Sequence, residues 1–267
     1  MAEAAQREAS DELLISRSEN GVVTLTLNRP ARKNAIPPHL WDPLRAVFHD
    51  VMESDARVLV ITGAGRAFCS GADLAAGGSG GPQTGPLDAM HPVNAAALAL
   101  HQLPKPSIAK VNGDAVGAGM NLALGCDLVV AGESARFSEI FVKRALSVDF
   151  GGTWLLPRFV GMHKAKELAL FGDMVSAKEA AELGIVNRVV ADAELDDFVD
   201  DWANRLAEGP PLAIQQSKRM ISNSFSTSFS EALNAEAAAQ SVNFGSKDTI
   251  EGFKAFLEKR KPDFKGR

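Results

Sequence analysis

A chain of 267 residues in which 46% are hydrophobic can bury a sizeable core, which excludes global disorder. Its net charge of −5 gives no electrostatic reason to bind nucleic acid or an anionic membrane. The acidic N-terminus lacks an apolar signal core, and no apolar run approaches the roughly 20 residues of a spanning helix. Cys69 and Cys126 lie in different segments and offer neither disulfide nor metal-ligand spacing, so we expect a cytoplasmic protein.

Strands and helices alternate over residues 22–131. A hairpin is predicted for LLISRSENGVVTLTLNRP (13–30), because Asn20-Gly21 is a strong two-residue turn signal. A helix should follow from Pro37 through Val51, where apolar residues recur at helical spacing, and another over 93–103. Buried strands are predicted at RVLVITG (57–63), SIAKV (107–111) and CDLVVAG (126–132), a loop with a short turn at 63–74, and a flexible low-complexity loop at 75–86. This alternation favours parallel βαβ winding.

After Gly151 the pattern becomes mostly helical. Helices are expected near residues 151–159, 161–171, 176–183, 194–208, 211–222, 228–244 and 246–259. We therefore expect an α/β core over residues 1–190 and a helical region over 191–267 that packs on the core or on another subunit.

A glycine-rich turn, Gly117-Ala118-Gly119, separates the 107–111 strand from an apolar helix. The first turn of a helix leaves N–H groups unpaired, and the helix dipole favours negative charge there. A dinucleotide fingerprint would need glycine where Leu122 stands, and a tight turn without any ligand is the simpler interpretation. However, a second loop, Ser70-Gly71-Ala72-Asp73, should reach the same sheet edge. Two N–H groups converging on one thioester oxygen would stabilise an enolate or a tetrahedral oxyanion.

Five segments together resemble the enoyl-CoA hydratase/isomerase (crotonase) family, in order and over nearly the whole chain. They are NRPARKNAI (28–36), ITGAGRAFCSGADL (61–74), VNGDAVGAGMNLALGCDLVVA (111–131), GGTWLLPRFVG (151–161) and EGFKAFLEKRKPDF (251–264). The resemblance implies an α/β fold, the crotonase-like ββα spiral core with a C-terminal helical region. It also implies an acyl-CoA substrate, no metal or redox cofactor because coenzyme A is part of the substrate, and assembly as a homotrimer or a dimer of trimers.

The resemblance also assigns the binding residues. The two oxyanion-hole N–H donors would be Ala72 and Ala118, the second of which is usually glycine in the family. Residues that would flank or line the CoA tunnel are Lys33, Ala35, Ile36, Ala67, Ser70, Asp73 and Leu74. Phe256 and Lys259 match the C-terminal helix that reaches CoA from a neighbouring subunit, although Lys259 in the basic run EKRK could equally be a solvated residue.

The acids decide which reaction is expected. Family hydratases use two glutamates to hold and activate water, and the matching positions here are Asn121 and Phe141. Asparagine can hold a water molecule but cannot take its proton, and phenylalanine can do neither. Glu139 lies two residues from Phe141, so on a short helix it is expected to point elsewhere.

Asp149 remains as the candidate acid. Family members with an aspartate at this place include ring-processing isomerases of phenylacetate catabolism and halobenzoyl-CoA dehalogenases, and SVDFGGTWLLPR resembles the isomerase type. An aspartate in an apolar pocket has a raised pKa and can shuttle a proton. The alternative is that Asp149 only caps a helix beginning near Phe150.

We therefore expect double-bond migration in an enoyl-CoA, with Asp149 as the proton shuttle. Two alternatives remain. One is a hydratase in which Asp149 and Asn121 hold the water, and the other is a catalytically silent acyl-CoA-binding or scaffold protein.

Overall fold

The structure is a computed structural model that describes residues 11–76 and 85–267. The predicted flexible loop at 75–86 lies for the most part outside the described residues. The main sheet has six strands in the order β1-β2-β3-β5-β7-β10. Their bounds are Leu13–Arg17 (β1), Val22–Leu27 (β2), Val58–Gly63 (β3), Ser107–Val111 (β5), Leu128–Gly132 (β7) and Arg188–Val190 (β10).

The predicted hairpin and the buried strands are confirmed. β1 and β2 pair antiparallel, and Gly21 takes the left-handed φ of 88° that the turn between them requires. The pairs β2–β3, β3–β5, β5–β7 and β7–β10 are all parallel. β3 is buried along its whole length, because helices cover both faces of the sheet at this strand.

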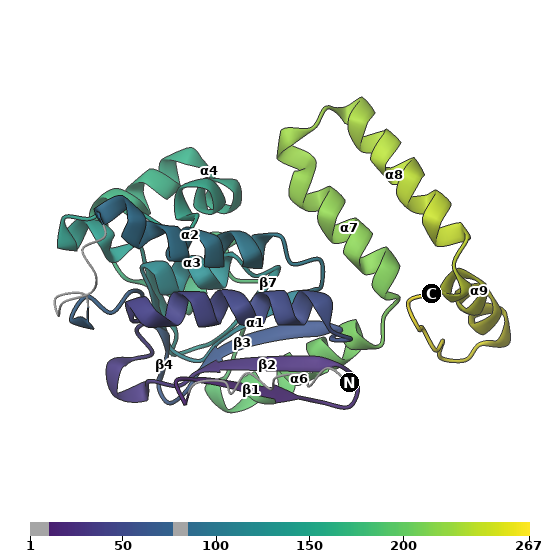
Figure 1. The fold of residues 1–267 in the computed structure, drawn as a ribbon, viewed down its shortest axis with the longest axis horizontal. Helices are drawn as coiled ribbons and strands as arrows, with labels where there is room; N and C mark the ends of the chain where they lie inside the picture. Colours follow the sequence, from purple (N-terminus) through teal and green to yellow (C-terminus); the bar gives the residue numbers. More distant parts are fainter. Residues whose placement is uncertain (1–10, 77–84) are drawn as a thin grey trace.

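The two faces of the sheet belong to two apolar clusters. α1 (Trp41–Glu53) and α2 (Pro86–His101) cover one face, where they pack against residues such as Leu59 and Ile61 of β3 (Figure 1). α6 (Leu195–Ala207) covers the other face, against Val58 and Val60 of the same strand. Alternate residues of one strand thus serve opposite layers, as the two-residue repeat of a strand demands.

A second sheet of four short strands stands beside the first, in the order β4-β6-β8-β9. Its strands are Ala67–Cys69 (β4), Asp114–Val116 (β6), Arg136–Ser138 (β8) and Val175–Ser176 (β9). The chain passes from β3 to β4, from β5 to β6 and from β7 to β8, so each turn of the ββα spiral contributes one strand to each sheet. The sequence pattern predicts a loop for the β4 segment and no strand at β6, because strands of three residues are too short to show a periodicity.

The helices after Gly151 agree closely with the prediction. They are α4 (Gly152–Phe171), α5 (Ala177–Glu182), α6, α7 (Pro211–Asn223), α8 (Phe229–Phe244) and α9 (Lys247–Glu258). The two predicted helices on either side of Gly161 are the two parts of α4, which bends at this glycine with φ 74°. The division at residue 190 stays a prediction, although α6, which follows that boundary, packs on the main sheet.

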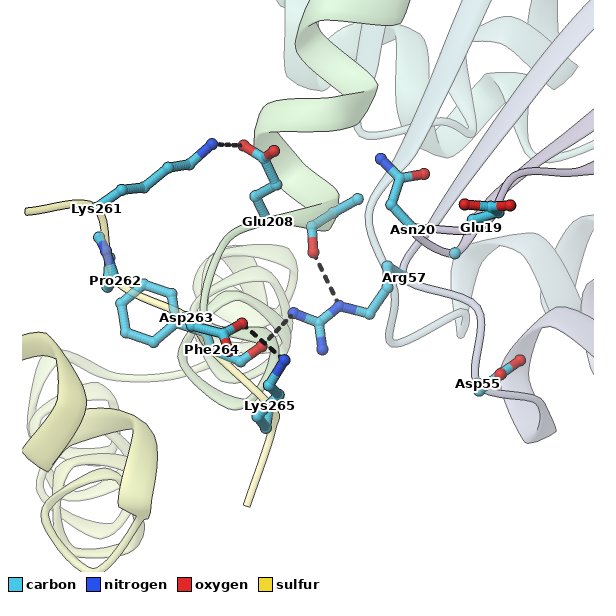
Figure 2. A pocket seen from close by; sticks show the side chains of 12 residues that line it. Glu19, Asn20, Asp55, Arg57, Glu208, Lys261, Pro262, Asp263, Phe264 and Lys265 are labelled. Carbon is cyan, nitrogen blue, oxygen red and sulfur yellow. Dashed lines mark hydrogen bonds and ion pairs between the residues drawn. The ribbon is translucent and has the colours of Figure 1, made fainter.

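The last residues of the chain fold back onto the core. Arg57, which precedes β3, donates hydrogen bonds to the carbonyl oxygens of Ala207 (3.0 Å) and Gly209 (2.8 Å) and reaches that of Phe264 (3.5 Å). Figure 2 shows this guanidinium between the end of α6 and the C-terminal segment. Glu208 pairs with Lys261 at 2.6 Å beside it. One arginine therefore ties together three parts of the chain that are distant in sequence.

α7, α8 and α9 extend away from the rest of the molecule (Figure 1). Large apolar side chains are exposed on them, among them Phe229, Phe244, Ile250, Phe253, Phe256 and Leu257. In the part of the chain that the structure describes, no helix combines the length and apolarity that crossing a membrane requires.

Candidate active site

The loop that carries Ala72 is held by the 28–36 segment. Ile36 donates its N–H to the Gly71 carbonyl (2.8 Å) and accepts from the N–H of Asp73 (2.9 Å), which makes an isolated parallel bridge. Both bonds use the neighbours of Ala72. The Ala72 N–H itself has no hydrogen-bond partner among the described residues, and Ala72 is exposed.

The second free N–H belongs to Ala118, the first residue of α3 (Ala118–Leu124). Gly117 before it has φ 58° and donates to the Ser138 carbonyl (2.8 Å), which fixes the turn to β8. Within residues 11–76 and 85–267 the Ala118 N–H has no partner either.

Glycines allow these two loops to touch. A Cβ on Gly71, where φ is +90°, would lie 2.9 Å from the Val116 oxygen and 3.3 Å from the Ala118 nitrogen. A Cβ on Gly119 would collide with the Cys69 carbonyl. Any larger residue at these two positions would push the loops apart. The two loops therefore present unpaired N–H groups from touching segments.

Asp149 lies where the chain enters α4. Phe150 after it has a left-handed φ of 49°, is buried, and packs against Trp41 with ring centroids 5.6 Å apart. The N-cap of α4 is Gly151, and no side chain accepts a hydrogen bond there. The alternative interpretation, that Asp149 only caps this helix through its side chain, is therefore wrong. Two consecutive residues with left-handed φ, Phe150 and Gly151, lie between Asp149 and the first residue of the helix.

The Asp149 carboxyl is half-buried, and its Oδ1 is a buried atom with no hydrogen-bond partner. Burial raises the pKa of Asp149 from 3.8 to about 6. A carboxylate of this kind is ionised near neutral pH, yet it holds a proton more readily than an exposed aspartate. These are the properties of a group that takes and returns a proton.

Asn121 and Phe141, the two residues that stand at the hydratase glutamate positions, both lie beside Asp149 or the glycine turn. Asn121 is fully buried and donates from Nδ2 to the Asp149 backbone oxygen (2.9 Å). The Phe141 ring lies 3.6 Å from the point that a Cβ on Gly117 would occupy. The structure thus brings Ala118, Asn121, Phe141 and Asp149 into one neighbourhood.

Glu139 belongs to the same neighbourhood, and the expectation that it points elsewhere is wrong. Its side chain is 1% exposed, and its Oε2 accepts a hydrogen bond from Asn121 Nδ2 (3.3 Å). Burial and the charge of Asp149 raise the pKa of Glu139 to about 8, although the bond from Asn121 opposes this shift. Glu139 precedes a 3-10 turn (Ile140–Arg144) rather than lying on a regular helix. The spacing of a regular helix therefore gave the wrong direction for the Glu139 side chain. A lone glutamate in the apolar run ARFSEIFV was the signal that could have pointed to it.

The residues predicted along the CoA tunnel come from two touching segments. Ala35, Ile36 and Ala67 are buried, whereas Lys33 and Leu74 are exposed and Ser70 and Asp73 are half-buried. Ser70 donates its N–H to the Lys33 carbonyl (3.0 Å), so the segments run side by side.

Two charged residues among them have partners within the chain. Asp73 pairs with Arg29 (2.9 Å), whose guanidinium lowers the pKa of that carboxyl, and Lys33 Nζ reaches Asp114 (3.2 Å).

Asn34, which no sequence motif marks as a site residue, joins these segments. Its Nδ2 donates to the carbonyls of Ala64 (2.9 Å) and Ala67 (2.7 Å), and its Oδ1 accepts from the Arg29 N–H (2.9 Å).

Phe256 and Lys259 are not brought to this site within one chain. Both are exposed on or just after α9, which lies far from β4 (Figure 1). Two cavities of about 500 and 420 Å³ are lined by other residues, the first by those in Figure 2 and the second by α7 and the end of α2. Neither is lined by Asn121, Glu139 or Asp149.

The sequence profile of the enoyl-CoA hydratase/isomerase family matches residues 17–267. This chain belongs to that family. It is 40% identical to a 1,2-epoxyphenylacetyl-CoA isomerase of Escherichia coli, over 96% of this chain and 99% of the relative. It is also 40% identical to a probable enoyl-CoA hydratase of Rhodobacter capsulatus, over 92% and 95% of the two chains.

Solved structures of the hydratase/isomerase family show the same crotonase fold. A putative enoyl-CoA hydratase from Streptomyces coelicolor superimposes with a TM-score of 0.93 at 33% identity, covering 100% of this chain and 98% of the other. An enoyl-CoA hydratase from Bacillus anthracis gives a TM-score of 0.91 at 34% identity, covering 96% and 100%. The predicted family and fold are confirmed, and the chain is an enzyme of this family.

Proposed function

We propose that this enzyme moves the double bond of an enoyl-CoA between neighbouring positions, with Asp149 as the single proton shuttle. The observation that carries the proposal is the Asp149 carboxyl, which is half-buried and has an unpartnered oxygen in the same neighbourhood as Ala118. Phe141 occupies a position where a hydratase of this family keeps a glutamate, so water has one activating group fewer.

The two free N–H groups would hold the thioester oxygen. In the proposed step, the Asp149 carboxylate takes the proton from the α carbon of a 3-enoyl-CoA, and the C–H electron pair enters a dienolate. The N–H groups of Ala72 and Ala118 stabilise the negative charge that develops on the thioester oxygen. Asp149 then returns the proton to the γ carbon, and the double bond lies between the α and β carbons. No cofactor beyond the CoA of the substrate is needed.

CoA itself would lie along the two touching segments. Ala35, Ile36, Ala67, Ser70, Asp73 and Leu74 would line its path, and Lys33 would meet its nucleotide end. Phe256 and Lys259 would contact CoA from a neighbouring copy in a trimer or a dimer of trimers. The exposed apolar side chains of α7 to α9 support such an assembly, since faces of this kind usually mark an interface. The buried free thiols of Cys69 and Cys126 are compatible with the expected cytoplasmic location.

A second candidate function is hydration of a 2-enoyl-CoA. The unpartnered Oδ1 atoms of Asn121 and Asp149 could accept both protons of one water molecule, which favours this alternative. Of the two relatives that are each 40% identical, one is named as an isomerase, of an epoxyphenylacetyl-CoA, and the other as a probable enoyl-CoA hydratase.

Product analysis on matched substrates tests the assignment. The enzyme is given a 3-enoyl-CoA and, separately, the trans-2-enoyl-CoA of the same chain length. We expect rapid appearance of the 2-enoyl product from the first and little 3-hydroxyacyl-CoA from the second. Hydration that survives Asp149→Asn would overturn the isomerase proposal, and binding of a broad acyl-CoA panel without any turnover would instead support the silent alternative.

A further inference from the structure

Three side-chain oxygens in one buried cluster lack any hydrogen-bond partner. They are Asn121 Oδ1, Glu139 Oε1 and Asp149 Oδ1, and only one other buried side-chain atom in the described residues, Arg158 Nε, is in this condition. The donor that the cluster contains, Asn121 Nδ2, is already shared between Glu139 and the Asp149 backbone. The cluster is therefore short of donors rather than of acceptors.

If Glu139 and Asp149 were both ionised, the shortage of hydrogen-bond donors would be greater. Both would be acceptors only, and their like charges would repel each other in a site that solvent screens poorly. A proton on one carboxyl converts an acceptor into a donor and leaves a single negative charge. Buried acceptors that lack donors cost free energy, so the cluster gains from that proton.

Burial indicates which carboxyl carries the proton. Glu139 is 1% exposed, whereas Asp149 is only half-buried. The pKa of Glu139 is raised to about 8 and that of Asp149 to about 6.

In the part of the chain that the structure describes, no cation is among the causes that shift the pKa of Glu139. Asp149 is the charged group that acts on Glu139, and it raises the pKa. Lys143 and Arg144 of the adjoining 3-10 turn are exposed, and Lys143 pairs with Asp173 instead. Arg158 of α4 stacks on the Trp154 ring and donates to the Trp154 carbonyl oxygen instead. From α3 the cluster receives Asn121, which is neutral.

We infer that Glu139 holds a proton in the resting enzyme and supplies it as a hydrogen bond to the acceptor oxygens around Asn121, so that Asp149 is the one negative charge of the site. Glu139 is then a positioning residue: it acts through Asp149 and does not exchange its own proton with the substrate. That the charge on Asp149 serves catalysis rests on the proposed function, but the protonation of Glu139 does not.

Turnover as a function of pH gives the first test. The wild-type kcat/KM should fall above about pH 8, because ionised Glu139 adds a second negative charge beside the forming enolate. The neutral isostere Glu139→Gln should keep kcat/KM at pH 7 within about threefold and lose this alkaline decline, whereas Glu139→Leu, which offers no donor, should lose about tenfold or more at every pH. An unchanged alkaline limb in Glu139→Gln, or a loss as large as that of Asp149→Asn, would overturn the inference.

Infrared spectroscopy of the same proteins tests protonation without turnover. Wild-type protein at pH 6.5 to 7 should show a protonated-carboxyl C=O band that Glu139→Gln lacks and that disappears near about pH 8. In Asp149→Asn the band should persist but disappear at lower pH, because the charge that raises the pKa of Glu139 is gone. This result would stand even if Asp149→Asn remained active and the proposed function failed. A Glu139 carboxyl that is already ionised at pH 7 would refute the inference.

The pH dependence of Tm provides a further control. Between the ordinary carboxyl pKa of 4.5 and about 8, the folded protein would bind a proton that the unfolded chain has released. Folding stability must then fall as pH rises through this window. The Tm of wild type should therefore decline relative to that of Glu139→Gln from about pH 5 to about pH 8, and a constant difference would contradict a protonated Glu139.

Discussion

The candidate site has a backbone half, the loops that present Ala72 and Ala118, and an acid half, the segment that carries Glu139 and Asp149, and the two halves offer different chemical groups. The first offers backbone N–H groups, fixed by glycines that let two loops touch. The second offers side chains in a buried cluster whose oxygens lack donors. Backbone donors survive most substitutions, since every residue except proline has an N–H. A side-chain carboxyl, in contrast, is lost whenever its residue is replaced by one without an acid. The backbone half should therefore tolerate substitution better than the acid half.

The largest effect is expected in the acid half, from Asp149→Asn. This change keeps the shape of the side chain and removes the proposed base, so kcat for isomerisation should fall at least about a hundredfold, within the range known for general bases, with little change in KM. Steady-state kinetics on a 3-enoyl-CoA provides the measurement. Asp173→Asn, an exposed aspartate paired with Lys143, is the control and should be silent. Retention of more than a tenth of the wild-type kcat would show that Asp149 is not the base.

The role of the backbone half can be tested by removing the N–H of Ala118 alone. Ala118→Pro removes one donor at the first position of α3, where helices tolerate proline, and should lower kcat/KM by about a hundredfold. Ala118→Gly keeps the N–H and should remain within a few-fold of wild type. Circular dichroism must show that both variants are folded. Equal activity of the two variants would exclude the Ala118 N–H from catalysis.

Asn34 holds the segments next to the backbone half together by hydrogen bonds, but it offers no group to the candidate site. Asn34→Ala leaves the buried carbonyl of Ala67 and the partly buried carbonyl of Ala64 short of a hydrogen-bond donor, so the free energy of unfolding should fall by about 2 kcal/mol, roughly thirtyfold in the folding equilibrium. Urea unfolding measures this loss. Asn223→Ala changes an exposed asparagine and should cost less than about 0.5 kcal/mol. Similar losses in the two variants would contradict the role assigned to Asn34.

The acid limb of the pH profile should report Asp149. Its pKa is raised to about 6, and only the carboxylate can take a proton, so kcat/KM should fall about tenfold per pH unit below that value. Rates between about pH 4.5 and 7.5, with stability checked at each pH, give the curve. An acid limb that starts near the ordinary aspartate value of 3.8 would mean that substrate does not meet a buried carboxylate.

The smallest effect is expected from Lys33, at the edge of the backbone half. Lys33 is exposed and pairs with Asp114, so Lys33→Ala should raise KM for an acyl-CoA by no more than about fivefold and leave kcat unchanged. The corresponding acyl-pantetheine, which lacks the nucleotide, should show no change. Lys164→Ala, which removes an ion pair with Glu167 outside the candidate site, is the control. The same rise with both substrates would exclude a contact with the nucleotide.

Much of the fold could be predicted because its signals are local. The Asn20-Gly21 turn, the buried run of β3 and the apolar faces of the C-terminal helices depend on residues close in sequence. The three-residue strands β4 and β6 carry too few residues for a pattern, and they pair with partners distant along the chain. Secondary structure this short is decided by what lies beside it.

The candidate site divides in the same way. The sequence by itself determined the family and the two glycine-rich loops. It also showed that Asn121 and Phe141 stand at the positions where hydratases of the family have glutamates. Only the tertiary structure decided the surroundings of the two acids. It gave Asp149 an unpartnered oxygen instead of a helix cap, and it placed Glu139 in contact with Asn121. The reason is physical: the pKa of a carboxyl depends on burial and on charges from other segments, and helical spacing cannot predict where a residue beside an irregular turn will point.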